Sequence, residues 1–159
     1  MAMEICNKGE ISVRAVVTRV QEAAVVIDGI VNGQIKQGFL ILLGIAPEDT
    51  EKEVIRLADK ICVTRVFEDE NGKMNLNLET VGGELLIVSQ FTLFADLKSR
   101  RPGFSAAAKP SIAIPLYEQF IKECQKKDFH VEHGEFGADM KVSSINDGPV
   151  TLLFDTDHL

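Results

Sequence analysis

Hydrophobic residues recur along this chain mainly as short runs separated by turn-forming residues. Apolar, β-branched stretches at 13–20 and 23–27 precede the turn pair Asp28-Gly29, a pattern that predicts strands and tight turns at the start of the chain. The apolar run at 39–45 is too short for most helices and predicts a buried strand, with Asn32-Gly33 expected to form a turn before it. The N-terminal part of the chain is therefore expected to build a β-sheet.

Two segments carry apolar residues at helical spacing instead. Thr50 followed by Glu53 is a capping-box pattern, and apolar residues then return every three or four positions, which predicts a first helix. These apolar positions are Val54, Leu57, Ala58 and Ile61. A second helix is predicted over 116–127, ending in lysines that suit the negative end of the helix dipole. Pro115 is expected to fix the start of this helix or to kink it.

The remaining pattern alternates between strands and turns. Strand character returns at 62–67 and again at 84–91, and the turn pair Asn71-Gly72 lies between them. The tail from 136 to 154 predicts two strands on either side of Asn146-Asp147-Gly148-Pro149. No internal repeat or linker interrupts these elements, so the 159 residues are expected to fold as one compact domain.

Composition narrows the class of protein further. No stretch approaches the roughly 18 consecutive apolar residues of a membrane span, and residues 1–10 lack the apolar core of a signal peptide. The cysteines Cys6, Cys62 and Cys124 are odd in number and far apart, which disfavours a disulfide framework and a zinc site. These observations favour a soluble protein of the cytoplasm with no membrane partner.

The distribution of charge limits how this protein could bind nucleic acid. Its formal net charge of −7 argues against binding along a long stretch, because that mode needs many contacts between cations and phosphates. One run without acidic residues contains Lys98, Arg100, Arg101 and Lys109. Charge alone favours a solvated loop here, and the alternative is a small contact surface for RNA.

Common catalytic motifs are missing from this sequence, which has no G-x-S-x-G, H-E-x-x-H, Walker or G-x-G-x-x-G pattern. His130 and His133 have the spacing of a metal pair but no matching ligands, so we interpret them as surface residues and expect no metal or cofactor. Two constellations remain, Ser89-Gln90-Phe91-Thr92 at the end of a predicted strand and 146–151 at a strand junction. Taken alone, each also fits an ordinary strand end or turn.

These two constellations, in this order, resemble the S-Q-F-T and N-x-G-P-V-T motifs of the D-aminoacyl-tRNA deacylase family. The similarity runs along most of the chain and includes the segments 14–20, 59–61, 67–75, 100–102 and 136–140. By this resemblance, residues 1–12 form an N-terminal extension and 13–159 form the deacylase domain. Val13 stands where the family usually begins with Met, Thr18 replaces a common Gln, and Pro115 falls in a segment that is usually freely helical.

The resemblance implies an α+β fold in which β-sheets, partly barrel-like, carry helices packed on one side. It also implies a homodimer that hydrolyses the ester bond between a D-amino acid and the 3′ end of tRNA. The expected partners are therefore tRNA and a second copy of the chain, with no DNA. Glycyl-tRNA has no side chain to reject and is expected to be hydrolysed, whereas L-aminoacyl-tRNA is expected to be rejected.

Individual residues receive roles from the same resemblance. Gly148-Pro149 is expected to be a cis pair that enters the active site of the partner subunit, where its backbone would collide with an L side chain. Three residues are expected to support that pair: Arg19, Asn146 and Thr151. The catalytic site is expected to consist of Ser89, Gln90, Phe91 and Thr92. The pocket for the terminal adenosine is expected to include Phe91 and Met140. Contacts to tRNA phosphates are expected from Lys98, Arg100 and Arg101.

Two questions stay open at the level of sequence. The nucleophile could be Thr92, or a water molecule assisted by the ribose 2′-OH and by backbone N–H groups; the lack of an evident base beside Thr92 favours water. The rival functions are a noncatalytic module that binds RNA ends and a sister deacylase of relaxed chirality. The intact residues Ser89, Gln90, Thr92, Gly148 and Pro149 argue against the noncatalytic module. By resemblance, the S-Q-F-T form of the first motif and Arg19 argue against the deacylase of relaxed chirality.

Overall fold

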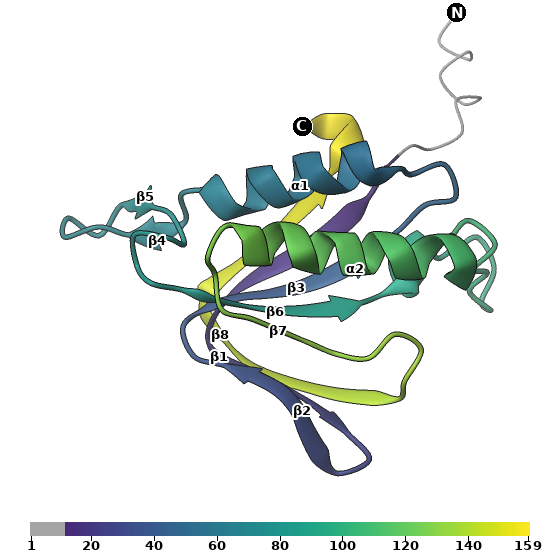
Figure 1. The fold of residues 1–159 in the computed structure, drawn as a ribbon, viewed down its shortest axis with the longest axis horizontal. Helices are drawn as coiled ribbons and strands as arrows, with labels where there is room; N and C mark the ends of the chain where they lie inside the picture. The colour runs from purple at the N-terminus through teal and green to yellow at the C-terminus, as the bar shows by residue number, and fades with distance from the viewer. Residues whose placement is uncertain (1–11) are drawn as a thin grey trace, which may run out of the picture.

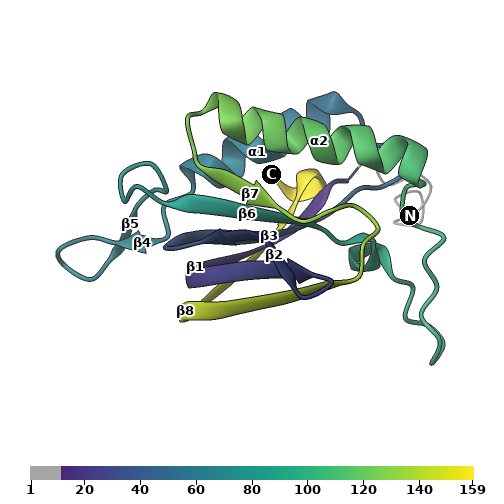
Figure 2. The same cartoon turned by 60° about the horizontal axis from the view of Figure 1, so that its bottom comes forward.

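A computed structural model describes residues 12–159, and in it a strongly curled sheet lies beneath two helices (Figure 1). The elements in chain order are β1 (Arg14–Ile27), β2 (Ile30–Ile35), β3 (Gly38–Gly44), α1 (Glu51–Val63), β4 (Phe67–Glu68), β5 (Met74–Leu76), β6 (Glu84–Ser89), the 3-10 turn η2 (Phe91–Phe94), α2 (Pro110–Lys126), β7 (Val131–His133), β8 (Met140–Asp155) and the 3-10 turn η3 (Thr156–His158). Both helices cover the same side of the sheet (Figure 2). The predicted α+β fold, with a barrel-like sheet and helices on one side, is confirmed.

The long strand β1 organises the sheet. It pairs antiparallel with β2, β3 and β8, and the order continues from β3 through the parallel neighbours β6 and β7. The two ends of this path approach each other, since Asn32 Nδ2 in β2 donates a 2.7 Å hydrogen bond to the carbonyl of His133 in β7. The sheet is therefore curled almost into a barrel.

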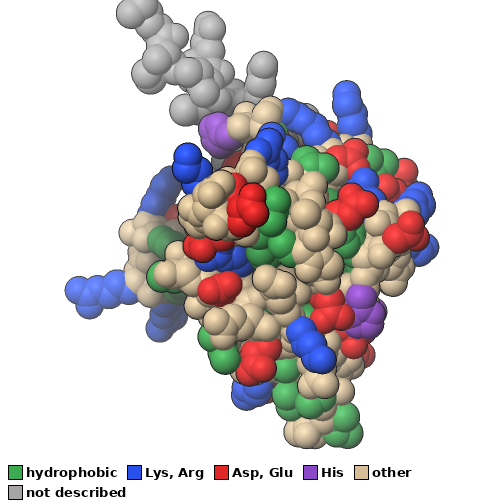
Figure 3. All heavy atoms as spheres, turned by 90° about the vertical axis from the view of Figure 1, so that its left-hand side faces the viewer, with side chains coloured by type: hydrophobic (Ala, Val, Ile, Leu, Met, Phe, Trp, Pro, Cys, Tyr) green, Lys and Arg blue, Asp and Glu red, His purple; other side chains and the backbone are tan. Residues whose placement is uncertain are grey.

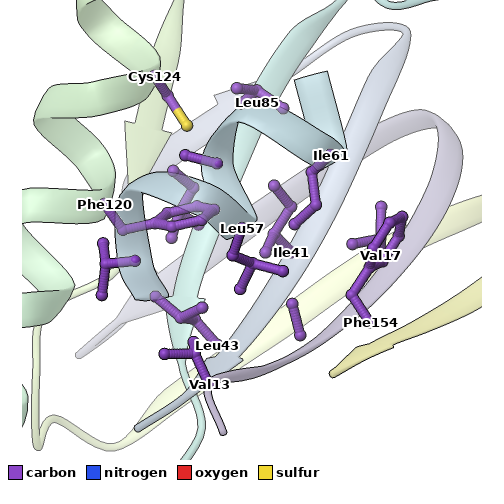
Figure 4. Packing of buried hydrophobic residues seen from close by; sticks show 14 of the residues in the cluster. Val13, Val17, Ile41, Leu43, Leu57, Ile61, Leu85, Phe120, Cys124 and Phe154 are labelled. Atoms are coloured by element: carbon purple, nitrogen blue, oxygen red, sulfur yellow. The ribbon is translucent and has the colours of Figure 1, made fainter. Parts of the chain in front are cut away.

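Alternation along the strands divides the core in two. In β3, the side chains of Phe39 and Ile41 belong to the cluster beneath the helices, whereas Leu40 belongs to the cluster inside the curl. The first cluster also contains helix residues such as Leu57 and Phe120, which pack against the sheet (Figure 4). Because each fully buried side chain of this size contributes roughly 1.5–3 kcal/mol, this layer holds the helices on the sheet.

The first helix was predicted correctly, and its N-terminus follows the expected capping geometry. The backbone N–H of Thr50 donates a 2.7 Å hydrogen bond to the Glu53 carboxylate. The strand predicted at 62–67 is wrong. Cys62 is a buried residue of α1, and only Phe67–Glu68 forms a strand in this region. The second helix begins earlier than predicted, at Pro110, and Pro115 lies inside it. Because proline has no N–H, the helix lacks one hydrogen bond to the Ser111 carbonyl.

The strand boundaries also differ from the prediction in three places. Residues 13–27 form one continuous strand from Arg14 rather than two. Asn32-Gly33 lies within β2, where Gly33 pairs with Val25 and a Cβ would come within 3.1 Å of the Glu132 Cβ of β7. The tail forms a single strand, β8, whose register against β1 is interrupted around Val20. Gly33 therefore allows β2 to approach β7 closely and does not form a turn.

The predicted N-terminal extension lies, except for Ser12, outside the described residues, as does Cys6. Ser12 is buried and its hydroxyl donates a hydrogen bond to the Asp155 carboxylate. Cys62 and Cys124 are both buried as free thiols. Within residues 12–159, no helix is both long enough and apolar enough to cross a membrane.

Asp49, in the loop before α1, is a buried carboxyl group with one unpaired oxygen. Its Oδ2 atom accepts a 2.6 Å hydrogen bond from the Ala46 N–H, whereas Oδ1 has no partner among the described residues. Burial raises the pKa of Asp49 to about 7, and the negative charges of Glu53, Asp157 and Asp155 add to this effect. The folded protein therefore holds this proton more tightly than the unfolded chain does.

We expect Asp49→Asn to stabilise the protein at alkaline pH. A folded-state pKa above the unfolded value means that stability falls as the pH rises towards and through 7, by on the order of 2 kcal/mol between pH 5 and pH 8. The neutral amide removes this loss, so the melting temperature of the variant should exceed that of wild type by roughly 4–8 °C more at pH 8 than at pH 5. Thermal unfolding at the two pH values measures the difference. Exposed Glu70→Gln is the control, and a pH-independent difference for Asp49→Asn would contradict the assignment.

Candidate active site

A hollow of about 1040 Å³ opens at the C-terminal end of β6. Ser89, Gln90 and Phe91 of the first motif line it, and Met140 faces it from the start of β8. Other lining residues, mostly apolar, are Val88, Phe104, Ile112, Phe136 and Val142. A largely apolar hollow with a few polar groups at one edge is typical of a site for a small organic group.

The first motif forms because the chain leaves the sheet abruptly after Ser89. The Gln90 N–H still donates a 2.8 Å hydrogen bond to the Leu43 carbonyl of β3, and the Leu93 N–H then turns back to the Gln90 carbonyl at 3.2 Å. The resulting turn η2 buries Phe94 and leaves Phe91 52% exposed beside the hollow. The first N–H groups of such a turn have no partner within it, so they are free to bind an oxygen atom.

Thr92 lies beside this hollow but does not line it. Its hydroxyl oxygen accepts a hydrogen bond from the Gln90 side-chain amide. An amide N–H donor cannot take up a proton, so this contact does not supply Thr92 with a base. The side chain of Gln90 is held in a fixed direction by the same contact.

Met140 reaches the hollow because the segment before it packs closely on β6. The Gly134 N–H donates a 3.0 Å hydrogen bond to the Ile87 carbonyl, which ties this segment to the strand. A Cβ at Gly134 would lie 2.5 Å from the Met140 sulfur, so the missing side chain leaves the space that Met140 occupies. Met140 and Phe91 thus line the same hollow.

The second motif is a protruding loop within β8. The Gly148-Pro149 peptide bond is cis, as predicted, and Gly148 has a φ of +131°. The Asn146 side chain closes the loop, because its Oδ1 accepts a 2.9 Å hydrogen bond from the Val150 N–H and its Nδ2 donates at 3.1 Å to the Thr151 hydroxyl. Gly148 and Pro149 remain exposed at the tip.

Arg19 holds this loop from below, and its side chain is only 5% exposed. Its Nε donates a 3.0 Å hydrogen bond to the Asp147 carbonyl, and its Nη1 donates at 2.6 Å to the Val66 carbonyl. The carboxylates of Asp147 and Glu68 lie 3.7 and 4.0 Å away. A buried guanidinium must be paired in this way to be tolerated, so Arg19 and the loop constrain each other. Arg19, Asn146 and Thr151 thus all make contacts within the loop that carries Gly148-Pro149.

The two motifs lie far apart within this chain. Arg19 in β1 pairs with Phe39 in β3, which pairs with Leu85 near the start of β6, whereas Ser89 ends that strand. Three strand spacings and a further run along β6 put the loop of the second motif roughly 20 Å from the first motif. The loop does not line the hollow, so the two predicted parts of the site are not brought together within this chain.

The predicted phosphate-binding residues lie on a small hairpin between η2 and α2. Asp96 and Gly103 exchange backbone hydrogen bonds of 2.7 and 2.9 Å and close its base. The connection that contains the hairpin extends away from the body of the protein (Figure 2). Lys98, Arg100 and Arg101 are exposed on it and do not line the hollow. Phe104, which follows the hairpin and does line the hollow, was missed because a lone aromatic residue in a polar loop has no periodic signal.

A metal site finds no support in the part of the chain that the structure describes. No group of three or more His, Cys, Asp or Glu side chains within 12–159 is arranged to hold an ion. His130 is exposed, with Nε2 at 3.8 Å from Glu84 and 3.9 Å from Glu132. On the face that carries the β4–β5 hairpin, acidic, basic and histidine side chains are interspersed (Figure 3). His130 thus lies beside two carboxylates, with no third potential ligand near it among the described residues.

Comparisons with known proteins concern nearly the whole chain. Residues 16–155 match the family model described as D-Tyr-tRNA(Tyr) deacylase. The chain is 53% identical over 144 residues to the D-aminoacyl-tRNA deacylase of Thermosipho africanus, covering 90% of this chain and 97% of that protein. It is 56% identical over 144 residues to the D-aminoacyl-tRNA deacylase of Thermus aquaticus, covering 90% and 95%.

Two solved structures are similar in fold. One is described as a c-Myc DNA unwinding element binding protein, with a TM-score of 0.83 and 40% identity over 89% of this chain and 97% of that chain. The other is described as a probable eukaryotic D-amino acid tRNA deacylase, with a TM-score of 0.79 over 91% of this chain and 99% of that chain. At 16% identity, the second likeness concerns the fold alone.

We expect Gly148→Ala to destabilise the second motif. A Cβ at Gly148 would lie 2.8 Å from Val150 Cγ2 and 2.9 Å from Arg19 Nη2, and the φ of +131° is one that alanine rarely adopts. The free energy of unfolding should fall by on the order of 1–3 kcal/mol, measured by urea denaturation.

Gly72→Ala is the matched control for this substitution. Gly72 has a φ of +73°, but no atom lies within 4 Å of the position that a Cβ would take, so only the backbone conformation is penalised, by roughly 1 kcal/mol. An equal loss in both variants would show that the contact with Arg19 does not constrain the loop.

Proposed function

The chain belongs to the D-Tyr-tRNA(Tyr) deacylase family and is a D-aminoacyl-tRNA deacylase, and from this premise we propose how its two motifs divide the reaction. The hollow at the end of β6 receives the terminal adenosine of the tRNA and places the ester bond beside Gln90 and Thr92. The observation that carries this proposal is the convergence of Ser89, Gln90, Phe91 and Met140 on one largely apolar hollow. An adenine ring fits such a lining, and Phe91 offers an aromatic face for it.

The second motif acts on the site of a second copy of the chain. Within one protomer, Gly148 and Pro149 protrude roughly 20 Å from the first motif, so they need a partner to act on. The strand that carries them, β8, pairs only with β1 among the described strands and has exposed apolar side chains at Val142, Ile145 and Leu153. An apolar edge strand of this kind favours association, and a two-fold dimer would place each loop at the partner's hollow.

In that position the loop selects the configuration of the amino acid. Gly148 offers bare backbone, and its carbonyl and that of Pro149 can accept hydrogen bonds from the ammonium group of a D-amino acid. An L-amino acid held by the same ester and ammonium contacts would direct its side chain into this backbone. Glycine has no side chain to exclude, so glycyl-tRNA is also a substrate. The filter ignores what the side chain is, and acceptance of D-amino acids is broad.

Water carries out the chemical step. The hydroxyl of Thr92 accepts its hydrogen bond from the Gln90 amide, which cannot act as a base for a nucleophilic threonine. The N–H groups that open η2 are suited to stabilise the negative charge on the carbonyl oxygen of the attacked ester. The ribose 2′-OH of the substrate assists the water, and Gln90 and Thr92 position it.

Other functions fit these observations less well. A noncatalytic module for RNA ends would have no need for the complete set of motif residues, and a deacylase of relaxed chirality would not need a loop fixed by Arg19. DNA binding is the function named for one structural relative. The net charge of −7 and the small size of the basic hairpin favour a local contact with tRNA instead. We place the enzyme in the cytoplasm, without a metal or cofactor.

Hydrolysis of matched substrates tests this function. The purified protein is mixed with the same tRNA carrying a D-amino acid, its L-enantiomer or glycine, and the release of free amino acid is followed. We expect fast release from the D-aminoacyl and glycyl forms and release from the L-aminoacyl form at the uncatalysed rate. Equal rates for both enantiomers would favour the sister deacylase, and binding without release would favour the noncatalytic module.

We expect Thr92→Ala to retain substantial activity. Loss of a true nucleophile reduces turnover by several orders of magnitude, whereas loss of a positioning hydroxyl should reduce kcat by about tenfold to a hundredfold. Single-turnover hydrolysis of D-aminoacyl-tRNA measures the effect. Thr80→Ala, which removes an exposed threonine hydroxyl that belongs to neither motif, serves as the control.

A tRNA ending in 2′-deoxyadenosine gives the complementary measurement. If the ribose hydroxyl assists the water, the wild-type enzyme should hydrolyse this substrate poorly. A covalent D-aminoacyl adduct on Thr92, or full-rate hydrolysis of the deoxy substrate, would contradict the mechanism.

A further inference from the structure

Phe104 is an exposed aromatic side chain at the mouth of the hollow. It is 40% exposed and meets Phe91, which is 52% exposed, with ring centroids 5.1 Å apart and ring planes at 78°. In this edge-to-face arrangement one ring points its edge at the other and keeps part of its own face open. Two partly open aromatic faces therefore stand next to each other and point in different directions.

The hairpin just before Phe104 presents cations to solvent. Its base is closed by Asp96 and Gly103, and its turn is ordered by a 3.0 Å hydrogen bond from the Lys98 N–H to Asp96 Oδ1. The side chains of Lys98, Arg100 and Arg101 are exposed, and none forms an ion pair with another residue of the described part of the chain. The nearest acidic group along the hairpin, Asp96, is engaged with backbone N–H. The loop that leads into the exposed ring is thus positively charged.

We propose that Phe104 and this hairpin form a second nucleotide subsite, which binds the penultimate nucleotide of the RNA 3′ end. This inference rests on the proposed function, in which the terminal adenosine occupies the hollow. The base before that adenosine stacks on the open face of Phe104, and Arg100 and Arg101 bind the phosphate that joins the two nucleotides. The edge-to-face angle then separates the two bases, which directs the terminal one into the hollow.

The chemistry of this surface favours a single-stranded nucleotide over other occupants. Aromatic faces flanked by cations bind single strands, because every base has a stacking face and every link carries a negative charge. A protein with a net charge of −7 repels RNA elsewhere, so a few exposed cations beside the site have a large relative effect on where the RNA docks. An acidic peptide could bind the same cations, but it would have no base to stack on the exposed rings of Phe91 and Phe104.

Three substrates of increasing length test this subsite. They are a D-amino acid esterified to adenosine, to the dinucleotide CpA, and to full tRNA. Phe104→Leu should raise KM by about tenfold more for the dinucleotide and the tRNA than for D-aminoacyl-adenosine, which has no second base, with kcat unchanged for all three. Phe104→Tyr, which keeps the aromatic face, should restore the wild-type KM.

Two further variants separate stacking from charge and from general effects of the hairpin. Arg100→Ala with Arg101→Ala should raise KM for the dinucleotide and flatten its salt dependence, but should not affect D-aminoacyl-adenosine, which has no phosphate. Leu97→Ala alters another side chain of the same loop, 73% exposed, and should change nothing.

The results distinguish this subsite from the proposed function. If Phe104→Leu impaired D-aminoacyl-adenosine as much as tRNA, Phe104 would only support Phe91 and the subsite would be excluded. Unchanged KM for the dinucleotide and the tRNA would also exclude it. If the wild-type protein hydrolysed none of the three D-aminoacyl substrates, the proposed function itself would be refuted.

Discussion

The side chain of Arg19 is charged but only 5% exposed, and the structure around the second motif depends on the contacts that pair this charge. Its guanidinium spans from the Asp147 carbonyl in β8 to the Val66 carbonyl after α1. Removing either partner would leave buried donors unpaired, which is strongly destabilising. The loop of the second motif therefore cannot move relative to β1, and β1 in turn pairs with three other strands of the sheet.

Under the proposed function, this rigidity serves a loop that acts on a second copy of the chain. The hollow lies at the far end of β6, and its lining includes neither Gly148 nor Pro149. A filter that rejects by collision has to be stiff, because a wall that yields by a fraction of an ångström accepts the wrong enantiomer. The exposed apolar side chains of β8 lie on the same strand as the loop, so dimer formation and placement of the filter would be one event.

Local patterns predicted some elements well and failed where distant segments meet. The capping pair Thr50 and Glu53 predicted the start of α1 correctly, because both residues lie within one helical turn. Gly33 suggested a turn, but its role is to let β2 approach β7, a contact between residues about a hundred positions apart that no local pattern encodes. Pro115 was expected to fix the start of α2 or to kink it, yet the helix begins at Pro110, and the packing of Leu116, Tyr117 and Phe120 outweighs one lost hydrogen bond.

The candidate site shows the same division. The motif residues could be found because their order resembles a known family, and the structure then places Phe91 with Met140 and Arg19 with Asn146 and Thr151. Phe104 could not be found, since its importance comes from lying beside Phe91 and not from its neighbours in sequence. The separation of the two motifs also depends on strand order, which the sequence did not predict.

Mixed dimers test the central claim, that each active site combines the hollow of one protomer with the loop of the other. One variant carries Phe91→Ala in the hollow and the other carries Gly148→Ala in the loop, so each homodimer has a defect in both of its sites. After the two are unfolded together and refolded, a shared site predicts one intact site in every heterodimer and recovery of about a quarter of the wild-type activity towards D-aminoacyl-tRNA. If the mixture is no more active than the separate variants, each site is built within one protomer and the claim is wrong.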